Sequence, residues 1–139
     1  MTGRRGGRLA AAALALALAG CGANNSAASS DSCDASAIGS AIDATAASSD
    51  APAKRADHLD DIAATITQCE ASSATASTDP KDPLNLQLAR AHLAAGKAYA
   101  QAGDTADARQ DLAGAAFTAK FVGDAALESE AVAALRALR

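Results

Sequence analysis

Apolar residues recur at intervals of three and four along two stretches in the first half of the chain. On the first stretch, which begins near Cys33, the positions on one face are Ala37, Ile38, Ala41, Ile42 and Thr45. On the second stretch they are Leu59, Ile62, Ala63, Ile66 and Cys69. This spacing is typical of amphipathic helices. Residues 48–52 interrupt it with a Ser-Ser-Asp-Ala-Pro segment, and proline suits the first turn of a following helix. The pattern therefore predicts a helical hairpin over residues 33–70.

Three further helices are expected within residues 83–139, after a polar linker over residues 71–82. Asp82 is a suitable N-cap and Pro83 a suitable first helical residue, so the first of these helices runs to residue 102. Its shared face consists of Leu88, Ala91, Ala95, Tyr99 and Ala102. A Gly-Asp dipeptide follows at 103–104 and again at 123–124, combining a helix stop with an N-cap. The second helix therefore ends near Val122. The third covers residues 125–138 and buries Leu127, Ala131, Ala134, Leu135 and Leu138.

Composition strengthens the helical prediction. Alanine accounts for 43 of 139 residues, and the aromatic residues are Tyr99, Phe117 and Phe121. Alanine has the highest helix propensity, and its small side chain lets helices pack closely around a thin core. We expect an all-α fold, either a small helical bundle or a short stack of helices.

The first twenty residues have the anatomy of a secretory signal peptide. Arg4, Arg5 and Arg8 precede an apolar run over residues 9–19, which is too short to span a bilayer as a stable helix. The tetrapeptide Leu18-Ala19-Gly20-Cys21 then resembles the lipobox of bacterial lipoproteins. A plain signal peptide followed by a chance cysteine is the alternative.

The lipobox resemblance implies cleavage after Gly20 and modification of Cys21 with diacylglycerol and an amide-linked acyl chain such as palmitate. Residues 21–32 are then a flexible tether to a lipid-anchored domain in the bacterial cell envelope. In an organism with two membranes, Gly22 in place of aspartate implies the periplasmic face of the outer membrane.

If Cys21 is acylated, Cys33 and Cys69 remain as an even pair in an exported, oxidising context. Residue 51, in the break of the predicted hairpin, lies midway between them, so two antiparallel helices bring the cysteines together. We therefore expect a disulfide, which contributes about 3–4 kcal/mol in the chain-entropy model. Two buried free thiols are the alternative.

Residues 89–120 resemble a tetratricopeptide repeat. The matching residues are Ala95, Gly96, Ala98, Tyr99, Gly103, Asp104, Ala108, Leu112 and Ala115. Gly96 and Ala108 allow two helices to approach closely. His92 stands where a large aromatic residue is usual, and Lys120 replaces the usual closing proline. The resemblance implies a peptide-binding face at Arg90, Leu93, Lys97 and Gln101. An alanine-rich hairpin without repeat ancestry, with Arg90 and Lys97 simply solvated, is the alternative.

The net charge and the absence of catalytic motifs exclude several classes of function. Loss of three arginines with the signal peptide leaves 9 basic and 16 acidic residues, a net charge of about −7 without a basic cluster, so nucleic-acid binding is not expected. His58 and Asp61 share a helix face, but two ligands are too few for a metal site. His92 is expected to be a packing residue at a helix interface. No nucleophile elbow or phosphate-binding glycine loop is present, so neither an enzyme nor a cofactor is expected.

These features predict an envelope lipoprotein that acts as a protein-interaction or assembly factor through a helical surface. Its expected partners are the lipid bilayer, through Cys21, and a protein or peptide of the envelope. One alternative is a small periplasmic lipoprotein that binds a ligand or metal between the hairpin and the repeat-like pair. Another is a structural or immunity-type lipoprotein.

Overall fold

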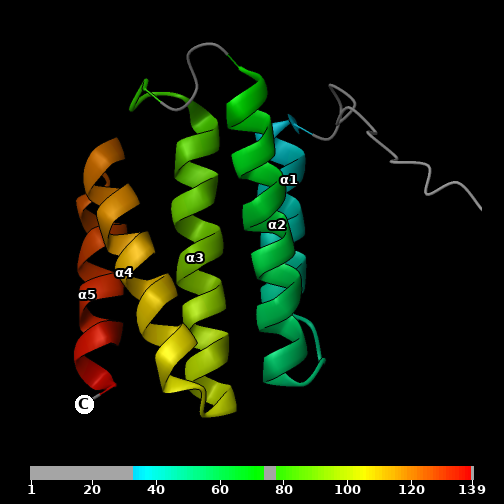
Figure 1. Cartoon of the computed structure of the whole chain (residues 1–139), viewed down its shortest axis with the longest axis vertical. Coiled ribbons are helices and arrows are strands. Elements are labelled where there is room, and N and C mark those ends of the chain that lie inside the picture. Colours follow the sequence, from blue (N-terminus) through cyan, green and yellow to red (C-terminus); the bar gives the residue numbers. More distant parts are fainter. Residues whose placement is uncertain (1–32, 74–77, 139) are drawn as a thin grey trace, which may run out of the picture.

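The chain folds into five helices, as seen in a computed structural model that describes residues 33–73 and 78–138 (Figure 1). They are α1 (Ala35–Ala46), α2 (Pro52–Ser72), α3 (Pro83–Ala102), α4 (Thr105–Val122) and α5 (Ala125–Ala137). Successive helices run in opposite directions, and the described residues contain no strand. The predicted all-α fold is confirmed as a compact helical bundle. The expected signal peptide, Cys21 and the tether lie outside the described residues.

Local sequence signals set most of the helix boundaries. Four aspartates are N-caps whose side chains accept a hydrogen bond from a backbone N–H in the first helical turn: Asp34, Asp82, Asp104 and Asp124. Gly103 and Gly123 follow α3 and α4 with φ values of 85° and 78°, in the left-handed region that favours glycine. α2 continues two residues into the expected linker, to Ser72, because no helix-stopping residue follows Cys69 at once.

α3 occupies the centre of the bundle and contacts each of the other four helices. It separates two apolar clusters. The cluster shared with α1 and α2 includes Ile38, Ile42, Leu59, Ile66 and Leu84. The cluster shared with α4 and α5 includes Leu93, Leu112 and Leu127 together with buried alanines. The core is therefore a thin layer of leucine, isoleucine and alanine on each side of one helix.

The close approach of α3 and α4 depends on small side chains. A Cβ atom added at Gly96 would lie 2.7 Å from Cγ and 3.0 Å from the backbone nitrogen of Leu112, closer than packed carbon atoms approach. Ala108 is fully buried in the same helix pair. The predicted role of Gly96 and Ala108 in close helix packing is confirmed.

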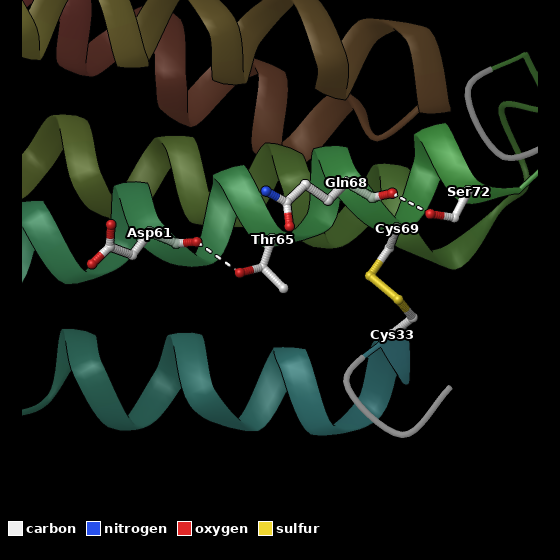
Figure 2. Close-up of a disulfide and its surroundings, with 6 residues drawn as sticks. All are labelled: Cys33, Asp61, Thr65, Gln68, Cys69 and Ser72. Atoms are coloured by element: carbon white, nitrogen blue, oxygen red, sulfur yellow. Dashed lines mark hydrogen bonds between the residues drawn. A yellow bond between two sulfur atoms is a disulfide. The ribbon is translucent and has the colours of Figure 1, made fainter. Parts of the chain in front are cut away.

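A disulfide joins Cys33, two residues before α1, to Cys69 in the last part of α2 (Figure 2). The Cα atoms of Cys33 and Cys69 are 5.6 Å apart, and the bond closes a sequence separation of 36 residues. Cys69 is buried in the apolar cluster beside α3. The predicted disulfide-stapled hairpin is confirmed, and its staple lies at the open end of the α1–α2 pair.

Candidate functional site: a groove along α3

The four residues expected to form a partner-binding face all line one groove of about 340 Å³. They are Arg90, Leu93, Lys97 and Gln101. Their spacing of three or four residues places them on one side of α3. The remaining walls come from α1, α2 and α5, and contribute among others Ile42, Asp43, Arg55, Leu59, Leu127 and Glu130.

Leu93 occupies the groove differently from its three neighbours. Its side chain is only 8% exposed and packs in the cluster shared with α4 and α5. It therefore belongs to the apolar lining of the groove, together with Ile42 of α1, Leu59 of α2 and Leu127 of α5. The open part of the predicted face consists of the polar residues.

Each of these polar residues is bonded to another helix across the groove. The Arg90 guanidinium donates to Asp43 Oδ1 on α1 at 2.7 Å and to Gln87 Oε1 at 2.9 Å. Lys97 forms an ion pair with Glu130 on α5. The contacts of α3 with α1 and α5 thus combine an apolar base with an ionic bridge at the groove.

The third bridge connects α2 to the same face of α3. The Arg55 guanidinium donates to Oε1 of Gln101 and, at 3.2 Å, to the carbonyl oxygen of Ser48 in the turn before α2. Arg55 therefore also fixes the α1–α2 turn against α3.

The groove bridges are partly solvated and weak. The Arg90 and Asp43 side chains are 33% and 70% exposed, and those of Lys97 and Glu130 are 44% and 52% exposed. Such pairs contribute about 0–1 kcal/mol each, because water and salt screen them. A carboxylate from another molecule can replace either internal carboxylate at small cost.

The groove also differs in charge from the rest of the chain. Three cationic side chains line it, from Arg55, Arg90 and Lys97, against the two carboxylates of Asp43 and Glu130. The local excess is one positive charge, whereas the whole chain carries a net charge of −4. Apolar lining with a cationic rim suits a segment that carries both apolar side chains and carboxylates.

A second pocket, of about 350 Å³, lies between α2 and α4 over another side of α3, that is, between the hairpin and the repeat-like pair, where the ligand-binding alternative expects one; its lining residues were not predicted. His92 Nδ1 lies 2.9 Å from Oδ1 of the buried Asp111, and the Tyr99 hydroxyl donates to Asp60 Oδ2 at 2.7 Å. His92 is a partly buried residue between α3 and α4, as expected, but it is also hydrogen-bonded. Asp111 lies between Ala108 and Ala115 on the buried face of α4. A charged residue in line with these alanines was the feature of the sequence that indicates a buried polar contact here.

Two groups in this pocket have shifted pKa values. Burial raises the pKa of Asp60 above its usual value. The hydrogen bond to Asp60, with burial in second place, raises the pKa of Tyr99 above its ordinary value of 10.0. A tyrosine that holds its proton so firmly is a hydrogen-bond donor rather than a base at neutral pH.

The other sequence candidates do not converge on a site. His58 and Asp61 are both exposed on α2. Across residues 33–73 and 78–138, no three histidine, cysteine, aspartate or glutamate side chains are grouped so that they could hold a metal ion. None of the helices in these ranges is both long and apolar enough to cross a membrane.

No family model, curated protein or solved structure matches this chain. The fold and the groove define it as an all-α helical bundle with an amphipathic surface groove.

Proposed function

We propose that the chain is a lipid-anchored protein of the bacterial envelope that binds a segment of a partner protein in the groove along α3. The observation that carries the binding part is the convergence of Arg90, Leu93, Lys97 and Gln101, chosen from sequence alone, on one groove with an apolar base and a cationic rim. The anchoring part is supported by the signal-peptide pattern and the lipobox-like Leu18-Ala19-Gly20-Cys21.

The proposed anchor holds the domain at the membrane through acyl chains on Cys21. A thiolate is the nucleophile that forms the thioether to diacylglycerol on Cys21. Each buried CH₂ contributes about 0.8 kcal/mol, so two or three acyl chains give a stable anchor where one chain is marginal. Confinement at the membrane raises the effective concentration of the groove for a partner in the same membrane.

The partner segment is recognised by both components of the groove. Its apolar side chains enter the groove above Ile42, Leu59 and Leu127, which are nearly buried and form its floor, as an amphipathic helix inserts apolar side chains into a groove. Its carboxylates bind Arg90 or Lys97 in place of the internal carboxylates.

Site-specific photo-cross-linking in intact cells tests this proposal. A photoreactive residue at Ala46, which is exposed and lines the groove, should form an adduct with the partner, whereas one at the exposed Ala113 of α4 should not. Lys97→Glu should weaken the Ala46 adduct about tenfold or more, because it opposes the partner's carboxylate. The matched control is Lys54→Glu, since Lys54 is exposed and pairs with Asp50 one turn away, outside the groove. Equal adducts at both positions, or equal effects of the two lysine variants, contradict binding in the groove.

A second candidate function is small-ligand binding in the pocket between α2 and α4. Its aspartates, His92 and the Tyr99 hydroxyl favour a small ligand with a cationic or hydrogen-bond-donating group. A panel of small amines should then raise the melting temperature of the protein, and Asp60→Asn should remove the increase. An unchanged melting temperature across the panel excludes this function for amines.

A further inference from the structure

The only two phenylalanines of the chain are both exposed. Phe117 is 76% exposed and Phe121 is 41% exposed, and they lie one turn apart on α4. The leucines and isoleucines of the described helices, by contrast, are buried or partly buried. Two neighbouring aromatic side chains in water are an apolar surface of the kind that marks a contact with another molecule or a membrane.

This aromatic pair lies at the end of the bundle where the N-terminal part of the chain joins it. α1 begins, α2 ends, α3 begins and α4 ends at this end (Figure 1). Val122, the residue after Phe121, lines a hollow together with Pro83 and Leu86. The last turn of α4 therefore lies beside the first turn of α3. The disulfide at Cys33 lies at the same end of the bundle.

Lys120 lies on α4 between the two phenylalanines and is exposed. Its ammonium makes no ion pair with any residue in the described parts of the chain. Two aromatic rings beside an unpaired lysine suit the boundary of a bilayer, because the rings enter the acyl region while the long lysine side chain reaches the headgroup phosphates.

The acidic residues at this end argue that apolar contact, rather than charge, drives the docking. Asp34, Asp82 and Asp124 are all N-caps here, and their carboxylates accept backbone N–H groups. These three carboxylates outnumber the two exposed lysines at this end, Lys81 and Lys120, so the described residues here present no cationic field that would select anionic lipids.

We propose that Phe117, Lys120 and Phe121 dock this end of the bundle on the lipid bilayer that anchors Cys21. The inference rests on the lipid anchor proposed above. Eleven residues lie between Cys21 and Cys33, so this part of the chain reaches about 40 Å at most when fully extended. The anchor therefore attaches the bundle to the bilayer at the end that carries the aromatic pair, and docking there leaves the groove, which extends along α3 toward Gln101, accessible from the side.

Single-tryptophan fluorescence tests the docking, because the natural chain contains no tryptophan. The full-length acylated protein is reconstituted in phosphatidylcholine vesicles, carrying Phe117→Trp, Phe121→Trp or Ala106→Trp. Ala106 is exposed in the first turn of α4, on nearly the same face as Phe117 and about 16 Å farther along the helix. It is thus a matched control on the same helix.

The two aromatic positions should report contact with the acyl region, and the control position should not. F117W and F121W should emit at shorter wavelength in vesicles and be quenched by lipids brominated on the acyl chain. A106W should emit as in water and stay unquenched. Because burial of one phenylalanine changes partition at least about tenfold, Phe117→Ser should strongly reduce the quenching of F121W.

Three results overturn the proposal. Quenching of F117W and F121W no greater than that of A106W refutes the docking while the anchor stands. A blue shift that brominated lipids do not quench and that disappears at a lower protein-to-lipid ratio assigns the surface to a second copy of the chain instead. Absence of acyl chains on Cys21, measured by intact mass on the same preparation, refutes the anchor and with it this inference.

Discussion

Replacing Gly96 by alanine should push α3 and α4 apart and destabilise the bundle. The new Cβ would lie 2.7 Å from Cγ, 3.0 Å from Cδ2 and 3.0 Å from the backbone nitrogen of Leu112. Leu112 is fully buried, and a backbone atom is among the contacts, so a rotamer change alone does not relieve the clash. Overpacking of this kind costs about 1–3 kcal/mol. The gain in helix propensity from glycine to alanine, about 1 kcal/mol, offsets part of it. We expect a net loss of up to about 2 kcal/mol in the free energy of unfolding.

Gly114→Ala is the matched control, because Gly114 is also inside a helix of the same pair. Its added Cβ would lie 3.6 Å from the nearest atom, on the His92 ring, which is an ordinary contact. This variant should gain up to about 1 kcal/mol from helix propensity alone. Urea unfolding followed by circular dichroism measures both variants, and a Gly96→Ala protein as stable as Gly114→Ala would falsify the close-packing argument.

Three further predictions concern the disulfide and two carboxyl groups. Reduction of the bond between Cys33 and Cys69 should lower the free energy of unfolding by about 4 kcal/mol, given the 36-residue separation; equal urea midpoints with and without a thiol reductant would contradict this. Asp60→Asn should lower the pKa of Tyr99 toward 10.0, and ultraviolet absorbance of the single tyrosine measures it; an unchanged titration would exclude the hydrogen bond as the cause. Glu70 is buried, and its Oε1 accepts no hydrogen bond from the described part of the chain. Burial raises the pKa of Glu70 above its ordinary value of 4.5. The folded state therefore binds the carboxyl proton more tightly than the unfolded state does. Ionisation of Glu70 therefore lowers the stability of the fold as the pH rises above 4.5. In urea unfolding, Glu70→Gln should be more stable than wild type at neutral pH but not below pH 4.5. A difference in stability that is the same at all pH values would rule out ionisation as the cause.

The helices and the staple were predictable because their signals are local. Asp82 and Pro83 specify the start of α3 through a cap and a fixed φ angle, and Gly103 specifies its end through a positive φ. The disulfide needed one further step, the antiparallel return of α2 along α1. That step followed from the symmetric position of the break between Cys33 and Cys69.

The partners across the helices were not predictable, because they depend on tertiary packing. Arg90 finds Asp43 at a separation of 47 residues, and many other carboxylates in this acidic chain were equally available in sequence. The pocket at His92 and Asp111 depends on the rotation of α4 against α3, which the spacing of alanines constrains only coarsely. Positions on one helix can be assigned to a face from sequence, but the side chains opposite them cannot.

The two ion pairs across the groove are weak enough for a partner to displace, and they make the proposed binding selective for acidic segments. Displacing Asp43 from Arg90, or Glu130 from Lys97, costs about 1 kcal/mol or less, because both pairs are partly solvated. Burying one leucine-sized side chain of the bound segment contributes about 1.5–3 kcal/mol. An acidic amphipathic segment therefore offsets the cost of displacement with its first buried apolar side chain. A basic segment of the same shape finds only Asp43 and Glu130 to pair with, both already bound to Arg90 and Lys97, and it faces a net positive charge. An acidic helical peptide should therefore bind the groove more tightly than its charge-reversed counterpart. Equal affinities for the two peptides would mean that the cationic rim has no part in recognition.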